Sequence, residues 1–200
     1  MTTKKSQEAA MISQFSLKLP ITLTLLLILM MTPITNSLAE TSADLENTLY
    51  LDLKDGRVTI VLRPDLAPNH VARIKELVRE GFYDSIVFHR VIAGFMAQTG
   101  DPTGTGSHGS GKKLDAEFSD EPHVRGTLSM ARSSNVNSAD SQFFIVFARA
   151  KHLDNNYTVW GKVTDGMRAV AKIKRGEPGS GRVTNPDKII RMQVAADAKN

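Results

Sequence analysis

One stretch of the chain combines a dense apolar pattern with two residues that can do chemistry. Residues 88–100 read FHRVIAGFMAQTG, so that Arg90 and Gln98 lie among large apolar side chains such as Phe95 and Met96. Apolar side chains at this density are mostly buried, and a buried charge without a partner is costly. The stretch is therefore either a core strand whose Arg90 reaches an acidic partner, or an apolar pocket with one cation and one amide in its wall. The second arrangement is how small-ligand sites are commonly built.

Three further segments favour the pocket. Residues 126–132 read GTLSMAR, residues 141–147 read SQFFIVF, and residues 153–163 read LDNNYTVWGKV. Together with FHRVIAGFMAQTGD, these segments resemble the cyclophilins, a family of peptidyl-prolyl cis-trans isomerases. The four segments occur in the family's order with near-family spacing, and the resemblance extends roughly from Tyr50 to the C-terminus. It implies an enzyme that accelerates X–Pro bond rotation in folding or flexible proteins, without a cofactor or a metal.

The resemblance assigns a role to each matching position. Arg90 matches the catalytic arginine of the family. The other matches bind substrate: the proline pocket (Phe95, Met96, Phe144 and Leu153), an amide that touches the substrate backbone (Gln98), and the groove along the peptide (Ala131, Arg132 and Gln142). Tyr157 stands where many eukaryotic members have His, and its polar tip on an aromatic body predicts retained activity.

Two positions depart from the pattern of the family. His152 stands where many eukaryotic members carry a Trp that helps to bind cyclosporin, which puts strong inhibition by cyclosporin in doubt. Arg132 and Ser133 replace the smaller or neutral residues common in the groove. This replacement predicts a changed preference for the residue before proline, with Arg132 favouring acidic peptides.

The elements that must position these residues are mostly strands. Strand-like runs cover residues 48–53, 58–62, 88–100, 126–132, 141–147, 157–163 and 188–194. Apolar residues at helical spacing predict two helices, over 69–80 and 165–175. Many strands with two short helices predict a mainly β fold, a closed barrel capped by helices, because closure removes exposed sheet edges. The resemblance implies the same architecture, with eight antiparallel strands and two α-helices.

The first 39 residues are interpreted as a separate segment. Lys4, Lys5 and Lys18 precede an uncharged run over 19–31, and small residues end at Ala39. This order is typical of a secretory signal peptide cleaved after Ala39, and the alternative is an uncleaved membrane anchor within residues 19–38. Residues 40–200 would then form the isomerase domain outside the cytoplasm, in the periplasm if the source is a Gram-negative bacterium.

Composition and motifs argue against several other classes of function. The formal net charge is +4 without a dense basic run, which does not indicate nucleic-acid binding, and the absence of Cys excludes disulfides and thiolate chemistry. The G-x-G-x-x-G pattern of residues 104–109 lacks a following helical pattern, so we interpret it as a flexible surface loop. The five His residues are scattered without hydrolase or metal-ligand spacing. The predicted partners are proline-containing polypeptides bound by a monomer, and the alternative function is a proline-peptide-binding module or holdase chaperone with little catalysis.

Overall fold

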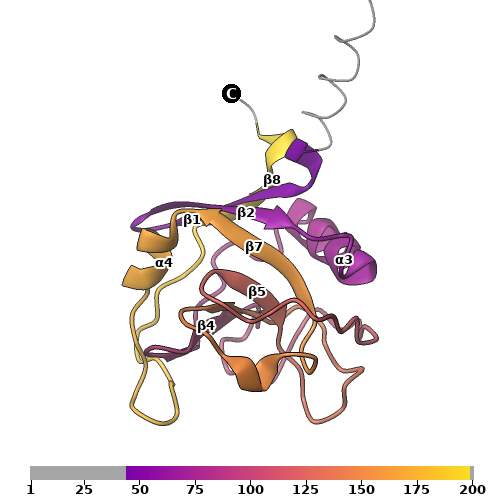
Figure 1. Cartoon of the computed structure of the whole chain (residues 1–200). Helices are drawn as coiled ribbons and strands as arrows, with labels where there is room; N and C mark the ends of the chain where they lie inside the picture. Colours follow the sequence, from indigo (N-terminus) through magenta and orange to yellow (C-terminus); the bar gives the residue numbers. More distant parts are fainter. Residues whose placement is uncertain (1–43, 199–200) are drawn as a thin grey trace, which may run out of the picture. The chain divides into compact units, whose positions relative to one another are not determined.

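The computed structural model describes residues 44–198, and the structure of the chain is reported for these residues. Eight antiparallel strands form one sheet in the order β3-β4-β6-β5-β7-β2-β1-β8 (Figure 1). Their bounds are β1 (Thr48–Leu53), β2 (Gly56–Leu62), β3 (Arg90–Ile92), β4 (Met96–Thr99), β5 (Thr127–Met130), β6 (Phe143–Val146), β7 (Val159–Asp165) and β8 (Arg191–Val194). The mainly β class and the eight antiparallel strands are thus confirmed. The predicted signal peptide, residues 1–39, lies outside the described residues.

The stretch around Arg90 forms two strands where the sequence predicted one. The sequence pattern predicted one strand-like run over residues 88–100, whereas the structure folds it into the hairpin β3–β4. The chain reverses at Gly94, whose φ of 71° is a left-handed conformation that glycine adopts without a steric cost. The single run was a wrong prediction because the apolar residues on both sides of the turn hide it.

The sheet curls, and its closure is approximate. The edge strands β3 and β8 are not paired with each other; instead, β3 and the residues before it bond to the residues that precede β8. Val91 N donates to Gly181 O at 2.7 Å, and Phe88 N donates to Asp187 O at 2.9 Å. Isolated bridges link Val87 to Lys188 and Arg90 to Arg182. The predicted closed barrel is therefore completed by irregular backbone rather than by a regular strand pair.

Two helices lie on opposite sides of the β1–β2 pair (Figure 1). Helix α3 (Pro68–Arg79) starts with a proline, whose fixed φ suits the first turn, and it packs on β7 and β8. Helix α4 (Met167–Lys172) packs on β2 and is shorter than the predicted 165–175. It begins late because β7 continues to Asp165, and Gly166 then turns the chain with a φ of 85°. Two short 3-10 helices complete the elements, η1 (Lys151–Leu153) and η2 (Ala195–Asp197).

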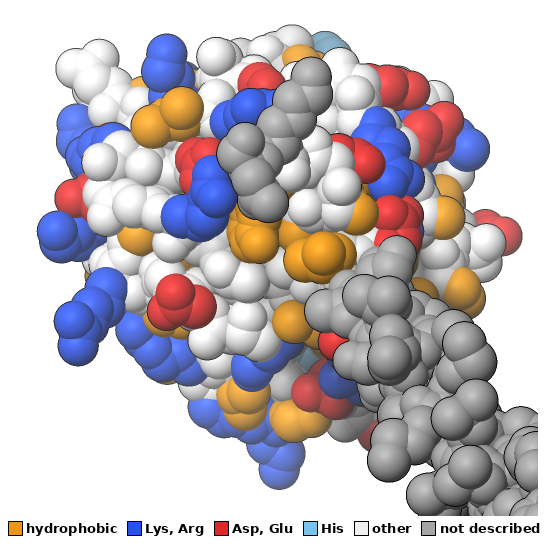
Figure 2. All heavy atoms as spheres, turned by 90° about the horizontal axis from the view of Figure 1, so that it is seen from above, with side chains coloured by type: hydrophobic (Ala, Val, Ile, Leu, Met, Phe, Trp, Pro, Cys, Tyr) orange, Lys and Arg blue, Asp and Glu red, His pale blue; other side chains and the backbone are white. Residues whose placement is uncertain are grey.

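The helices of residues 44–198 are too short or too polar for any of them to span a bilayer. On the face shown in Figure 2, basic and acidic side chains are interspersed, with scattered hydrophobic side chains between them. Ion pairs on the surface include Arg79, which contacts both Glu46 and Asp197. Such exposed pairs each contribute little to stability, because water and salt screen them.

The pleat of the strands sorts the apolar side chains into two clusters. Val91, Ala97, Phe143 and Ile145 point into the main core, where Trp160 is fully buried. The residues next to them point to the other face of the same strands, because successive side chains of a strand alternate. Each large side chain buried in the main core contributes about 1.5–3 kcal/mol. The barrel interior thereby provides a rigid support for whatever lies on the outer face.

Candidate active site

A row of paired residues runs across four neighbouring strands on that outer face. Arg90 of β3 lies opposite Gln98 of β4. Gln98 lies opposite Phe144 of β6, which in turn lies opposite Ser129 of β5. Directly paired residues of antiparallel strands project from the same face, with β-carbons about 4.5–5.5 Å apart. The sheet therefore brings a guanidinium, an amide and an aromatic ring side by side.

Apolar side chains around this row form a cluster separate from the main core. Its buried members are Met96, Phe144, Val146, Ala150 and Leu153, and Ile92, Phe95, Ala131 and Tyr157 pack against it at partial exposure. The Tyr157 ring meets the Phe144 ring edge-on, with centroids 5.8 Å apart. A partly open apolar cluster offers a binding surface for a ring of similar polarity.

Hydrogen bonds to neutral oxygens hold the Arg90 side chain at the border of this cluster. Its Nε donates to Ser180 O at 3.2 Å, and its Nη1 donates to Gln98 Oε1 at 3.3 Å. Within residues 44–198, no carboxylate pairs with Arg90 and no hydrogen bond occupies its Nη2. The core-strand alternative, in which Arg90 reaches an acidic partner, is therefore not what the described residues form.

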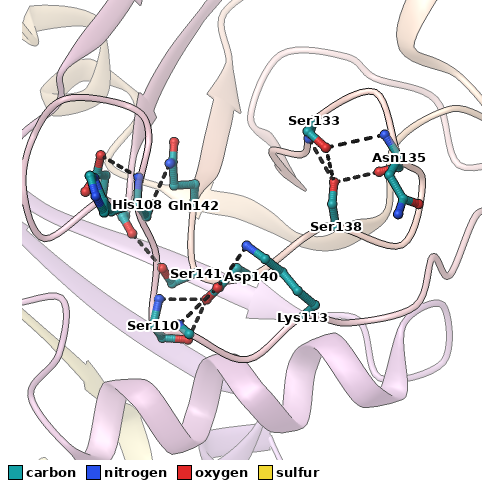
Figure 3. Close-up of polar contacts among 12 residues, drawn as sticks. His108, Ser110, Lys113, Ser133, Asn135, Ser138, Asp140, Ser141 and Gln142 are labelled. Atoms are coloured by element: carbon teal, nitrogen blue, oxygen red, sulfur yellow. Dashed lines mark hydrogen bonds and ion pairs between the residues drawn. The ribbon is translucent and has the colours of Figure 1, made fainter.

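The amide of Gln98 connects Arg90, through Gln142, to the loop that contains Gly106 and His108. Gln98 Nε2 donates to Gln142 Oε1 at 2.9 Å. Gln142 Nε2 donates in turn to the carbonyl oxygens of Gly106 and His108, at 3.0 and 2.8 Å (Figure 3). Each amide uses its oxygen toward one neighbour and its nitrogen toward the next, so the orientation of all three side chains is linked.

A cavity of about 340 Å³ lies beside the two amides. Four residues predicted to bind substrate line it: Gln98, Ala131, Arg132 and Gln142. The Arg132 guanidinium donates to Asn156 O and Ser133 O and lies 4.7 Å from the centroid of the Tyr157 ring. Its charge is thus fixed at the cavity wall by neutral groups.

Two buried carboxylates organise the loop that borders this cavity. Burial disfavours the charge of Asp101, but hydrogen bonds from Thr103, His108 and Gly106 outweigh burial and hold its pKa well below 3.8. Burial likewise opposes the charge of Asp140, and donors from Ser110 and Lys113 again lower the pKa (Figure 3). Within residues 104–109, the backbone N–H groups of Gly106 and His108 donate to Asp101, which holds this loop beside the cavity.

The structure also contains a Ser–His–Asp arrangement. Ser129 Oγ lies 3.1 Å from His123 Nε2, and His123 Nδ1 lies 3.2 Å from Asp154 Oδ1. A serine nucleophile must reach a substrate carbonyl, yet Ser129 and His123 have no exposed surface. The hydroxyl of Ser129 also lies 2.8 Å from Thr158 O. This geometry is sealed from substrate and does not support hydrolysis.

Elsewhere in the described residues, we find a second cavity but no cluster of metal ligands. A cavity of about 530 Å³ lies between α3 and residues 112–117, where basic and acidic side chains of both signs line it. Its mostly charged lining differs from the apolar lining of the outer cluster. Among residues 44–198, no group of three His, Asp or Glu side chains could hold a metal ion.

Residues 48–194 match the family model described as cyclophilin type peptidyl-prolyl cis-trans isomerase/CLD. The chain belongs to this family. The resemblance predicted from four segments is thereby confirmed, and so is the enzyme class, peptidyl-prolyl cis-trans isomerase.

Individual cyclophilin-type relatives agree with the family model. A probable peptidyl-prolyl cis-trans isomerase of Brucella suis biovar 1 (strain 1330) is 57% identical over 171 residues, which cover 79% of this chain and 87% of the relative. Peptidyl-prolyl cis-trans isomerase B of Bacillus subtilis (strain 168) is 42% identical over 133 residues, which cover 65% of this chain and 92% of the relative.

Solved cyclophilin structures share the fold. A cyclophilin from Hirschia baltica superposes with a TM-score of 0.70 at 28% identity, covering 78% of this chain and 76% of that one. A cyclophilin-type isomerase from Cryptosporidium parvum, solved in the presence of the dipeptide Ala-Pro, gives a TM-score of 0.68 at 28% identity. The match covers 76% of this chain and 99% of that structure.

The cyclophilin fold brings the predicted site residues together on one face. The apolar ones, Phe95, Met96, Phe144, Leu153, Ala131 and Tyr157, all belong to the outer cluster, and the polar ones, Arg90, Gln98, Gln142 and Arg132, border it or the adjoining cavity. Their roles in binding and catalysis remain predictions. Sequence reasoning missed Ile92 and Val146, which an alternation count from Arg90 and Phe144 places on the same face.

Proposed function

We propose that this cyclophilin binds a prolyl ring on the outer apolar cluster and rotates the preceding X–Pro bond with help from Arg90. Rotation meets a barrier of about 18–20 kcal/mol, set by amide resonance. On twisting, the prolyl nitrogen becomes pyramidal and gains a lone pair. A donor aimed at that nitrogen stabilises the twisted form more than either planar form, which is differential binding of the transition state.

The observation that supports this role is the environment of Arg90. Two neutral oxygens fix its guanidinium at the edge of the cluster, and Nη2 remains without a partner among residues 44–198. A guanidinium stays protonated and holds its donors in a rigid plane, so the remaining N–H groups keep their direction. One charge-assisted hydrogen bond contributes about 1.5–3 kcal/mol. Binding and orientation in the pocket must therefore supply much of the acceleration.

The substrate side of the proposal follows from the apolar cluster and the adjoining cavity. The prolyl ring would lie against Phe95, Met96 and Phe144, and the peptide backbone would continue past Gln98 along the cavity wall. The Cryptosporidium relative solved in the presence of Ala-Pro supports proline-containing peptides as the ligand class. Flexible or unfolded polypeptides expose such segments, which makes them the proposed clients, bound by a monomer.

Exchange NMR on an Ala-Pro peptide tests the proposal. A small amount of the protein should broaden the cis and trans signals or produce exchange cross-peaks between them. Without the protein neither should appear, because uncatalysed exchange takes tens to hundreds of seconds. A proline-binding module or holdase would instead shift the peptide signals in a saturable way without accelerating exchange. That second outcome would replace the isomerase proposal with the binding alternative.

Arg132 provides a prediction about substrate preference. Its charge has no acidic partner among the described residues and lines the cavity, so wild type should favour peptides with Glu over Gln before proline. The expected ratio of kcat/KM is about threefold, since exposed charge pairs contribute up to about 1 kcal/mol. Arg132→Gln should make the two peptides equal, while Arg57→Gln on β2 should leave the ratio as it is. An unchanged ratio in Arg132→Gln would assign the preference elsewhere.

For residues 1–39 we propose a cleaved export signal, supported by the basic start, the uncharged run and the small residues before Ala39. The processed protein would then work outside the cytoplasm, in the periplasm of a Gram-negative source. Sequencing the N-terminus of the protein from its native host should give Glu40 as the first residue. A first residue within 1–18 would favour the membrane-anchor alternative.

A further inference from the structure

A buried imidazole lies directly behind the apolar cluster. His123 has no exposed surface, and its ring stacks on that of Phe144 with centroids 6.3 Å apart and planes at 23°. The mechanism proposed above makes no use of this ring. Because burying an ionisable group is costly, its position calls for a physical explanation.

Hydrogen bonds tie His123 to two segments that carry the cluster. Its backbone N–H donates to Asp154 Oδ1 at 2.9 Å, and Nδ1 lies 3.2 Å from the same oxygen. Ala150 N donates to the carbonyl oxygen of His123 at 2.9 Å. Ala150 and Asp154 flank η1, which carries Leu153. His123 thereby fixes both ends of η1.

The other edge of the ring contacts the strand beside Phe144. Nε2 of His123 lies 3.1 Å from the hydroxyl of Ser129. Ser129 is paired with Phe144 across the sheet. The imidazole therefore connects the segment that carries Leu153 with the strand that adjoins Phe144, while its own ring face supports Phe144.

We propose that His123 is a positioning residue of the proline pocket, joining Asp154 to Ser129 so that Leu153 and Phe144 keep the spacing that grips a prolyl ring. The proposal rests on the function proposed above. It also makes the pocket sensitive to the protonation of one buried ring.

The protonation state of His123 decides which acceptor the Ser129 hydroxyl can bond. The Ser129 hydroxyl lies 3.1 Å from Nε2 and 2.8 Å from Thr158 O, and its single proton serves only one of them at a time. A neutral ring that donates from Nδ1 to Asp154 accepts this proton at Nε2. A charged ring donates from both nitrogens, so the proton of Ser129 must turn to Thr158. Protonation thus reorganises the contact next to Phe144.

The surroundings of His123 set the pH at which this happens. Burial disfavours the charged ring most strongly, Asp154 favours it, and Arg149 and His152 disfavour it, so the pKa of His123 lies below 6.5. The neutral ring therefore predominates at pH 7. An unfolded chain takes up this proton near pH 6.5, before the folded one does, so the neutral arrangement loses stability as the pH falls below about 6.5. Within the folded protein the ring becomes charged only at a lower pH, around the lowered pKa of His123, and the efficiency of the pocket should decline in that range.

The test compares His123→Leu and His123→Gln with a matched buried histidine. His70 also has no exposed surface and pairs with a carboxylate, Glu117, at 2.6 Å, but it lies at the start of α3 in the main fold. By exchange NMR, His123→Leu should lower kcat/KM by about tenfold, mainly through KM, as loss of a charge-assisted hydrogen bond implies. His123→Gln keeps a donor and an acceptor and should recover most of this loss. His70→Leu should change kcat/KM less than about twofold, because the pocket contacts are intact.

A pH series supplies the second readout. In wild type, kcat/KM should decline as the pH falls through the pKa of His123, which burial places below 6.5, and His123→Gln should abolish this decline because amides do not titrate. His152→Gln controls for the neighbouring ring, which lies 5.3 Å from Phe95. Three results overturn the proposal: equal losses in His123→Leu and His70→Leu, a decline that persists in His123→Gln, or one that only His152→Gln removes. If His123→Leu does not fold, the pH series on His123→Gln decides alone. An inactive wild type would refute the proposed function instead.

Discussion

Replacing Arg90 by Ala is expected to lower kcat/KM for an X–Pro peptide by about 10- to 100-fold, the loss that corresponds to one charge-assisted hydrogen bond of about 1.5–3 kcal/mol. The effect should lie in kcat, because the hydrogen bond to the prolyl nitrogen forms only in the twisted state. The apolar cluster does not depend on the guanidinium for its packing, so KM should change little. Exchange NMR at several peptide concentrations separates the two parameters.

Two further arginine variants make this result specific. Arg90→Lys keeps the charge but loses the planar fork that bonds Ser180 and Gln98, so it should recover only part of the activity. Arg57→Ala removes a surface arginine that pairs with Asp52 on the neighbouring strand, and it should leave catalysis unchanged. If Arg90→Ala keeps wild-type kcat/KM, the pocket alone accelerates rotation and the arginine mechanism is wrong.

The environment of Arg90 shows how far sequence reasoning reaches. The side chains of residues 88–100 alone allow either a core strand or an apolar pocket beside a cation, and alternation places His89 and Arg90 on opposite faces. The family resemblance then identifies Phe144 and Leu153 as neighbours. The structure supplies the reason: the sheet places Phe144 of β6 on the outer face, and η1 brings Leu153 into the same cluster.

Other features of the site were beyond the sequence because they depend on contacts between distant residues. Nothing local to Ser180 indicates that its carbonyl oxygen anchors Arg90, since that contact depends on how the chain crosses the gap between β3 and β8. His123 likewise belongs to no motif. Its position behind Phe144 depends on contacts with Asp154 and Ser129, which local sequence does not reveal. The hairpin turn at Gly94 was hidden by continuous apolarity on both sides.

The second large effect is expected from two neighbouring phenylalanines that point to opposite faces of β6. Phe144 lies in the outer cluster, so Phe144→Ala should raise KM and lower kcat/KM by about 10- to 100-fold, as the loss of about 1.5–3 kcal/mol of apolar contact with the prolyl ring implies. Phe143 lies in the main core, with its ring edge-on to Tyr83 and Trp160 at 5.5 and 5.3 Å. Phe143→Ala should therefore lower the free energy of unfolding by about 3–5 kcal/mol.

The two variants should separate loss of stability from loss of activity. Phe143→Ala, assayed well below its Tm, should keep kcat/KM within about twofold of wild type, because the pairing of β6 with β4 and β5 holds Phe144 in register on the outer face. If Phe143→Ala does not fold, Phe143→Leu is the milder substitution, with a smaller expected loss because it keeps most of the apolar volume. Urea unfolding and exchange NMR on the same samples measure both quantities. Equal losses of activity in the two variants would mean that catalysis follows the stability of the barrel as a whole, and the outer cluster would then not be the proline pocket.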